Sequence, residues 1–484
     1  MGTDRRQRNV SAGRTADYLS QRYQERVFGV HGKNGSDLLI QPYLTGERIL
    51  KIRLKTKAHL YLPGIHGIIS EEQICEYACM LYFMSMLIQA FFVAITDQDR
   101  FSLLVGTGIP LMLVFLLICI NPRKYMNYTF LGIILFIIGF FTFTYLLHPE
   151  YYEYYIKDGY GVKDIFIPYR GVFTLLFVML PNDPVKIRRC VRYAGWFMFI
   201  FFGWMILQAY TRGYWLGVGV RNNAKMSYSV GFGYMVLPYC LVWMNDALKY
   251  KRGADIAGAL ISFVMILIGG SRGTIVFIAG FLILYFIRSF LKSSNKGRLL
   301  VEAICASALI LALYRHILTA VQRVMSTFGM SSRFVNTMLN GTVTNDNNRF
   351  KIWKAALDMI RQNPLGAGAF GTRPVISPYV YSGYPHNIIL EILAEFGVIP
   401  GVIILGFLAY YSIKILFFSE DEEWTHLFLP FFAAACSLLL SMTFWTSTPF
   451  WGAVGIGIGY FRCIRKRKKE GVTNLRPEMG ALHK

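Results

Sequence analysis

The sequence predicts an all-α polytopic membrane protein with about twelve transmembrane helices and one large extracytoplasmic loop between the ninth and the tenth. Three observations support this prediction. Of the 484 residues, 54% are hydrophobic and 16% are aromatic, which is unusual for a soluble domain. The apolar residues form repeated runs, several of them long enough for a membrane helix. The basic residues fall in alternate connections between these runs, as the positive-inside rule expects.

The chain begins with a basic polar arm, residues 1–76, whose first part has the composition of a disordered segment. Alternating apolar and charged residues at 46–54 allow a short strand or an interfacial segment. We expect the arm to lie in the cytoplasm against anionic lipid; docking to a protein of the same pathway is the alternative. The net charge of +22 would suggest a nucleic-acid partner in a soluble chain, but its distribution here favours a membrane protein and no nucleic acid.

Nine transmembrane helices are predicted within residues 77–314 and three within residues 388–463. The clear apolar runs are 78–95, 103–120, 130–147, 193–210, 228–244, 256–268, 275–290, 299–313, 388–417, 427–442 and 450–460. A weaker run, 165–180, is interrupted by Pro168 and Arg170. Several runs are shorter than the roughly 20 residues that cross a bilayer, so we expect their ends to extend into aromatic flanks.

The connections predict the orientation of the helices. Basic residues gather near 123–124, 186–189, 249–252 and 288–298, and in the tail 464–484, so these segments and both termini are predicted to be cytoplasmic. The acidic segment 419–423 falls on the same side, where acidic residues weigh little in the rule. Residues 315–387 then form the large extracytoplasmic loop. All eight cysteines lie in apolar runs or beside basic cytoplasmic ends, so we expect no structural disulfide and no metal framework.

The large loop contains a predicted amphipathic helix at residues 349–361. Ile352, Ala356, Met359 and Ile360 recur at helical spacing, and the Asn363-Pro364 pair ends the helix. A glycine-rich segment follows, with Gly366, Gly368 and Gly371. Its backbone N–H groups could bind phosphate; a flexible turn is the alternative interpretation.

Three elements in this region resemble the O-antigen ligase and Wzy-type polymerase superfamily. They are Gly270-Ser271-Arg272-Gly273, then Arg349-x-x-x-Trp353 followed by Asn363-Pro364-Leu365-Gly366-x-Gly368, then His386-Asn387-x-x-Leu390-Glu391-x-Leu393-x-Glu395-x-Gly397-x-x-x-Gly401. The resemblance covers approximately residues 212–401 and does not reach the N-terminal arm. It implies a lipid-linked glycan as donor and His386 as the base.

Three arginines in segments predicted to face outward could bind a diphosphate: Arg221, Arg272 and Arg349. Arginine makes forked, charge-assisted hydrogen bonds to phosphate. For each of them, an interfacial or helix-surface cation is the alternative interpretation. His386 stands just before a predicted helix start, where a neutral imidazole can take a proton near neutral pH. Without its neighbours it would be interpreted as a solvent-facing loop residue.

Four further residues are predicted to support the site: Ser271, Asn387, Glu391 and Glu395. The two carboxylates would lie inside the membrane, where ionisable residues face a polar cavity or a partner. Glu395 could pair with an arginine and Glu391 could orient His386; hydrogen bonds that close helix packing are the alternative. The one Asp-x-Asp motif in an outward connection, Asp97-Gln98-Asp99, lies in a tight turn. We therefore expect no metal site and no cofactor.

The leading hypothesis is a metal-independent, inverting glycosyltransferase on the outer face of a bacterial inner membrane. The donor would be a glycan on undecaprenyl or another polyprenyl diphosphate. The long arm favours a polymerase of O-antigen, capsule or exopolysaccharide repeat units over a ligase acting on lipid A–core or a protein O-oligosaccharyltransferase. A lipid-linked glycan flippase is the alternative of another class, although we expect neither repeated halves nor broken helices. The predicted partners are the donor, a glycan or lipid acceptor, membrane lipids and other polysaccharide-assembly proteins.

Overall fold

The computed structural model describes residues 70–96, 99–216, 225–226, 229–327, 332–340 and 349–469. Arg221, most of the basic arm and the end of the C-terminal tail lie outside the described residues. The first described helix begins at Glu71 behind Ser70, whose hydroxyl accepts a hydrogen bond from the Gln73 N–H while the Gln73 side chain accepts one from the Ser70 N–H. This capping box fixes where the helix starts.

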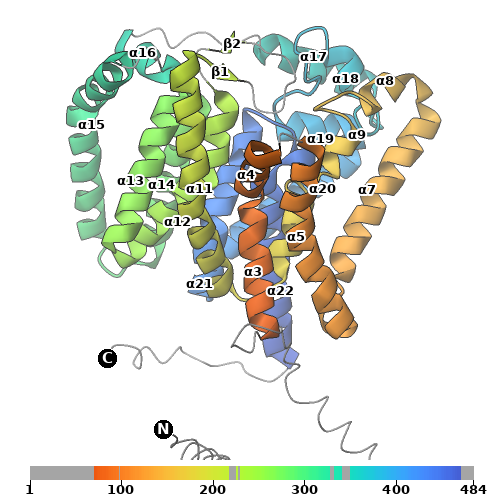
Figure 1. Ribbon diagram of the computed structural model, residues 1–484, viewed down its shortest axis with the longest axis horizontal. Helices are drawn as coiled ribbons and strands as arrows, with labels where there is room; N and C mark the ends of the chain where they lie inside the picture. The colour runs from red at the N-terminus through yellow and green to blue at the C-terminus, as the bar shows by residue number, and fades with distance from the viewer. Residues whose placement is uncertain are drawn as a thin grey trace, which may run out of the picture. The chain divides into compact units, whose positions relative to one another are not determined.

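The described chain is almost entirely helical (Figure 1). The long helices are α5 (Asp99–Ile120), α7 (Tyr128–Leu147), α11 (Pro184–Arg212), α12 (Val230–Tyr250), α13 (Gly253–Gly269), α14 (Arg272–Lys292), α15 (Lys296–Thr327), α20 (Val398–Phe417) and α22 (Thr448–Lys469). Those of intermediate length are α3 (Glu71–Phe83), α4 (Ser85–Thr96), α16 (Arg333–Asn340), α17 (Arg349–Gln362), α19 (Ile388–Phe396) and α21 (Glu422–Ala435).

Short elements connect these helices. They are α6 (Pro122–Tyr125), η1 (Pro149–Tyr151), α8 (Tyr152–Tyr155), α9 (Val162–Ile165), α10 (Phe173–Met179), α18 (Arg373–Ile376), η2 (Cys436–Leu439) and η3 (Phe444–Thr446). Two two-residue strands, β1 (Trp215–Leu216) and β2 (Lys225–Met226), pair antiparallel. The weak apolar run 165–180 forms only α10, after a break that contains Pro168 and Arg170.

The helices confirm an all-helical membrane protein. Among the described residues, six helices are long and apolar enough to cross a bilayer, and the bent pair α3–α4 makes seven if it is one span. The six lie within α5, α7, α11, α14, α15 and α20. The count of twelve stays a prediction, because α12, α13, α21 and α22 coincide with predicted apolar runs without meeting this criterion.

Two of the clear predicted apolar runs are each divided between two α-helices, and a third, 427–442, passes from α21 into η2, contrary to the expectation of continuous helices. α3 and α4 meet at Met84 with a bend of 66°. The run 388–417 divides at Gly397 into α19 and α20. Gly397 has φ +87°, a conformation that side chains with a Cβ rarely adopt, so the break is set by this residue.

The peripheral helices expose large apolar side chains. Leu146 on α7, Leu311 on α15 and Ile399 on α20 are 73%, 71% and 72% exposed. An aqueous surface would not favour such a concentration of apolar groups, whereas a bilayer solvates it. The core, by contrast, is filled by side chains such as Phe177, Trp243 and Trp445, each at most 2% exposed.

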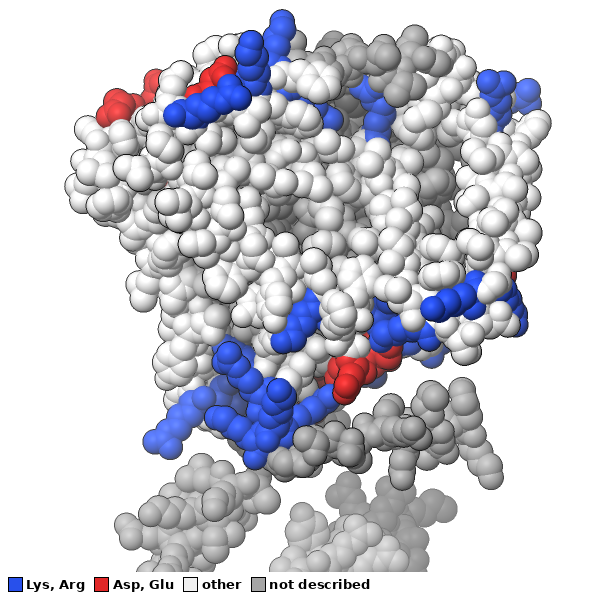
Figure 2. Space-filling view, turned by 180° about the vertical axis from the view of Figure 1, so that it is seen from behind, with Lys and Arg blue, Asp and Glu red and all other residues white. Residues whose placement is uncertain are grey.

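Charged residues gather at the two ends of the helices, with a mainly uncharged band between them (Figure 2). The basic connections predicted to be cytoplasmic meet the acidic segment 419–423 at one end. Glu422 pairs with Arg288 and Lys292, Lys249 Nζ lies 2.7 Å from Glu423 Oε1, and Arg467 Nη1 lies 2.9 Å from Asp421 Oδ2. The acidic segment therefore belongs on the same side as the basic residues that neutralise it.

A buried charged cluster joins four helices near this end. Asp246 of α12 and Asp255 of α13 are both fully buried. Arg192 of α11 pairs with both of them, His426 Nε2 of α21 lies 2.8 Å from Asp246 Oδ1, and Arg188 Nη1 lies 3.4 Å from the same oxygen. Removing one member would leave a buried charge uncompensated, which is strongly destabilising. The cluster thus fixes α11, α12, α13 and α21 relative to one another.

The other end carries α16, α17 and α18 (Figure 1), and its exposure to the cell exterior can be measured by cysteine labelling. Gln362 ends α17 and Gly297 lies at the start of α15; both are exposed. In a variant with serine at the exposed Cys119 and Cys305, we expect Gln362→Cys to react with an impermeant thiol reagent on intact cells. Gly297→Cys should react only after permeabilisation, and the reverse pattern would contradict the predicted orientation.

Candidate active site

The predicted loop helix is confirmed as α17, and it holds the segment that precedes His386. Its buried residues are Ile352, Ala356, Met359 and Ile360, as the helical spacing predicts. On another face, Trp353 Nε1 donates a hydrogen bond of 3.1 Å to the carbonyl of Pro385. Arg349 lies one turn before Trp353, so the two side chains share a face of the helix. The two predicted motifs are therefore joined directly.

His386 stands in a strained and closely supported position. Its φ is +54°, which is uncommon for a residue other than glycine. The next residue, Asn387, caps α19: its Oδ1 accepts from the N–H groups of Ile389 and Leu390 at 3.0 and 3.2 Å, and its Nδ2 donates to the Leu439 carbonyl. The imidazole packs against the ring of Tyr384, with centroids 4.6 Å apart, and its Nε2 lies 3.4 Å from Ser382 Oγ.

The surroundings of His386 favour a neutral imidazole. Burial is the larger cause, and the positive charge of Arg349 the second, of a pKa lowered from 6.5 to about 4. Part of the residue is still accessible to solvent, although protein atoms surround the ring closely. At neutral pH the side chain therefore has an unprotonated nitrogen that can accept a proton. The structure thus places the helix that begins at Arg349 against the segment that carries His386.

The two buried glutamates bind packing partners. Glu391 and Glu395 are 1% and 2% exposed. Thr443 Oγ1 donates to Glu391 Oε1 at 2.6 Å, and Trp445 Nε1 donates to Glu395 Oε2 at 2.9 Å. Among the described residues neither carboxylate lies within 4.0 Å of an arginine, and no hydrogen bond joins Glu391 to His386. These contacts correspond to the packing alternative, in which the two residues fix α19 against the α21–α22 connection.

The glycine-rich segment does not offer its N–H groups to a phosphate. Ala367 N–H donates to the Ala394 carbonyl at 2.9 Å and Gly368 N–H to the Glu395 carbonyl at 3.0 Å. These bonds satisfy carbonyl groups in the last turn of α19, which have no partner within the helix because it breaks there. Ala369 N–H donates to Thr144 Oγ1, and Phe370 N–H donates to Glu395 Oε1 at 3.2 Å. The segment therefore has a structural role: its N–H groups complete the hydrogen bonding where the helix is broken.

The Ser-Arg-Gly element lies where α13 ends and α14 begins. Gly270 ends α13 with φ +74°, and the buried Ser271 precedes the half-buried Arg272 at the start of α14. α12 packs closely against this element. A Cβ at Gly233 would lie 2.8 Å from that of Ser271, and any side chain at Gly273 would collide with the hydroxyl of Tyr234.

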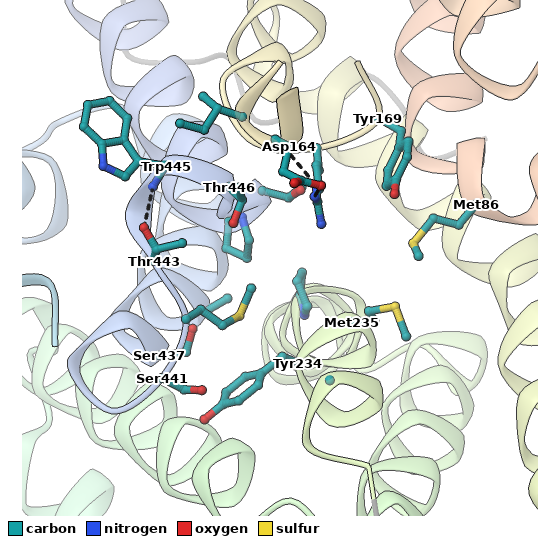
Figure 3. Close-up of a pocket in the computed structure, with 18 of the residues that line it drawn as sticks. Met86, Asp164, Tyr169, Tyr234, Met235, Ser437, Ser441, Thr443, Trp445 and Thr446 are labelled. Atoms are coloured by element: carbon teal, nitrogen blue, oxygen red, sulfur yellow. Dashed lines mark hydrogen bonds and ion pairs between the residues drawn. The ribbon is translucent and has the colours of Figure 1, made fainter. Parts of the chain in front are cut away.

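A cavity of about 470 Å³ lies beside these elements (Figure 3). Tyr234, which contacts the Ser-Arg-Gly element, and Tyr384, which contacts His386, both line it. Figure 3 shows Tyr234 and Ser441 on one side of the open space and Asp164 across from them. The cavity thus connects two predicted elements, although His386, Arg272 and Arg349 are not among the residues that line it.

Sequence analysis missed the charged residues of the cavity: Asp164, Arg170 and Arg373. Arg170 interrupts the apolar run 165–180, and this interruption was the one available signal. Arg373 lies outside the three motifs, and nothing in its neighbours distinguishes it from a loop cation. The site is therefore wider than the motifs. It includes residues from α9, the segment before α10, α12, α18 and the α21–α22 connection.

The fold and the site define a class: an all-helical membrane protein whose cavity has a net positive lining and includes Tyr384, the residue that packs against His386. Residues 257–406 match the family model described as O-Antigen ligase, a range that contains Ser271, Arg272, Arg349 and His386. This part of the chain is therefore similar to the O-antigen ligase family, and the resemblance in sequence is confirmed. The family implies a membrane enzyme that acts on glycans. Comparisons with curated proteins and with solved structures found no match.

The break between α19 and α20 predicts a specific sensitivity at Gly397. A Cβ there would lie 2.5 Å from the carbonyl of Leu365, and its backbone conformation, φ +87° and ψ 168°, adds a strain of roughly 1–3 kcal/mol for a residue other than glycine. We expect Gly397→Ala to lower the thermal stability of the purified protein. Gly406→Ala in α20 is the matched control, because nothing lies within 4 Å of its added Cβ. Equal melting temperatures for the two variants would contradict the close approach.

The effect of Arg349 on His386 can be measured by titration. In the wild type, carbethoxylation of His386, taken as the difference from a His386→Asn variant, should show a midpoint near pH 4. Arg349→Gln should raise this midpoint, but only part of the way to 6.5, because burial is the larger cause. Arg361→Gln on the exposed side of the same helix should leave it unchanged. A wild-type midpoint near 6.5 would show that the imidazole is not desolvated.

Proposed function

We propose that this protein is a metal-independent, inverting glycosyltransferase that uses a polyprenyl-diphosphate-linked glycan on the outer face of a bacterial inner membrane. The observation that carries the proposal is that α17, which begins at Arg349, is hydrogen-bonded to the residue before His386, whose ring packs against Tyr384 in the wall of the cavity. The family match supports the glycan chemistry. The gathering of basic connections at the opposite end supports an outward-facing site with both termini in the cytoplasm.

In the proposed reaction, Arg272 and Arg349 bind the donor diphosphate, with Arg221 as a third candidate outside the described residues. His386 takes the proton of the acceptor hydroxyl, whose oxygen attacks the anomeric carbon as the bond to the diphosphate breaks. In-line attack inverts the configuration, and the leaving group departs as polyprenyl diphosphate. Arginine stabilises the charge that develops on this group, so the mechanism needs no metal ion. Ser271, Asn387, Glu391 and Glu395 hold the elements that carry these groups.

Polymerisation of O-antigen, capsule or exopolysaccharide repeat units is the favoured activity, with glycan transfer to lipid A–core or to protein as the alternatives. A flippase is less well supported even though two helices are broken. The break at Gly397 is filled by hydrogen bonds from the glycine-rich segment, so it lines no passage. Mass spectrometry of the products from purified protein and lipid-linked repeat units distinguishes these activities. Chain growth indicates a polymerase, transfer to another acceptor a ligase, and relocation of unchanged lipid a transporter.

Substitutions at the proposed catalytic groups should abolish or impair turnover. His386→Asn removes the base while keeping a side chain that tolerates positive φ, so we expect normal membrane insertion and no product. Arg272→Lys and Arg349→Lys keep the charge but lose the fork; loss of such a contact costs on the order of 10²–10³ in rate. Arg361→Lys is the control. Wild-type turnover in His386→Asn, or in both lysine variants at saturating donor, would exclude the assigned roles.

A further inference from the structure

Arg373, the first residue of α18, is a buried cation in the wall of the cavity. It is only 3% exposed. Its Nη1 donates to the carbonyls of Tyr154, at 3.1 Å, and Tyr160. The guanidinium lies over the ring of Phe370, with the central carbon 3.1 Å from the ring centroid. These contacts fix the plane of the guanidinium group, and both hydrogen bonds come from Nη1.

The other edge of Arg373 carries Nε and Nη2, which form two parallel N–H donors. Within the part of the chain that the structure describes, neither atom has a hydrogen-bond acceptor, and no carboxylate lies within 4.0 Å of the guanidinium. Neither Nε nor Nη2 is one of the fully buried side-chain atoms that lack a partner, so both remain accessible. This edge has the geometry that binds a carboxylate or a phosphate through two hydrogen bonds at once.

The charge of Arg373 is kept and is incompletely balanced. Burial lowers its pKa to about 10, opposed first by Glu395 and then by Glu391, so it is protonated at neutral pH. Those two carboxylates are held by Trp445 and Thr443, outside ion-pair distance. A buried charge without a close partner is costly. Such a cation in a cavity wall is typical of a site whose partner is a ligand.

A second cation of the cavity is already paired. Arg170 Nη2 lies 2.9 Å from Asp164 Oδ1, and Arg170 Nε donates to the Asp164 carbonyl. Asp164 also accepts the Gly161 N–H through Oδ2. Two arginines and one carboxylate thus make the charged lining of the cavity, a net positive balance. The hydroxyl groups of Tyr160, Tyr384 and Thr443 supply neutral polar contacts nearby.

We propose that the Nε–Nη2 edge of Arg373 is an anion subsite that takes a carboxylate or phosphate group of the substrate, separate from the arginines at Arg272 and Arg349. Only the identity of the substrate rests on the proposed function; the binding of an anion does not. Two sources share this chemistry. One is an acidic sugar of the glycan, and the other is the diphosphate of a lipid-linked substrate.

The test measures binding of four probes to the full chain in nanodiscs by equilibrium dialysis: methyl glucuronide and methyl glucoside, farnesyl diphosphate and farnesol. We expect an anionic probe to bind more tightly than its neutral counterpart. Arg373→Gln should weaken that binding about tenfold or more, since a charge-assisted pair is lost. The matched control Arg361→Gln, an exposed arginine on α17, should leave it unchanged. If the binding of methyl glucuronide depends on Arg373, the ligand is an acidic sugar. If the binding of farnesyl diphosphate depends on Arg373, the ligand is the lipid diphosphate.

A second variant covers the case in which Arg373→Gln fails to fold. Asp164→Asn keeps an oxygen for the Gly161 N–H and removes the negative charge beside Arg170. It should tighten anion binding severalfold, a gain that misfolding does not produce. If both anionic probes bind Arg373→Gln and Asp164→Asn as they bind the wild type, the subsite is excluded while the catalytic proposal stands. If the probes respond but His386→Asn turns over normally, the catalytic proposal falls and the subsite stands.

Discussion

The site depends on one buried carboxylate at the break of a helix. Glu395 lies in the last turn of α19, where its carbonyl accepts from the Gly368 N–H and its side chain accepts from the Phe370 N–H and from Trp445 Nε1. A broken helix inside a membrane must satisfy its free backbone groups within the protein. The glycine-rich segment does so here, and Gly397 permits the close approach. Because that segment continues into Phe370 and α18, the same contacts set the wall of the cavity. His386 is held at the other end of α19, by the Asn387 cap.

The charged groups divide the molecule into two functional ends. At one end many arginines, lysines and carboxylates form ion pairs, as around Asp246 and in the contacts of Glu422 and Glu423. These pairs join neighbouring helices. At the other end Arg170 is paired with Asp164, but Arg373 has no close carboxylate among the described residues. Paired charges stabilise a fold, whereas a cation without a paired acid is available to an anion. The contrast between the ends is what favours ligand binding at the second.

The sequence predicted elements whose determinants are local. The buried face of α17 follows from the spacing of Ile352, Ala356, Met359 and Ile360, and the start of α19 just after His386 follows from the apolar run that begins there. The contacts that complete the site are remote: Arg373 binds the carbonyl of Tyr154, 219 residues away, and Thr144 accepts from Ala369 across 225. No local pattern encodes such partners. For the same reason the glycine-rich segment indicated a flexible backbone, but its sequence could not show that its N–H groups donate to acceptors on α7 and α19.

Electrostatic coupling within the site bears on when the proposed base becomes effective. The imidazole of His386 is neutral but a weak base, first because it is buried and second because Arg349, which has no carboxylate partner among the described residues, adds a positive charge. A diphosphate bound at Arg349 would cancel that repulsion and raise the pKa of His386 towards the range in which general bases work best. The donor would thereby strengthen the base that activates the acceptor. Proton transfer then becomes easier when the leaving group is in position, which links the two halves of the reaction without any movement of the helices.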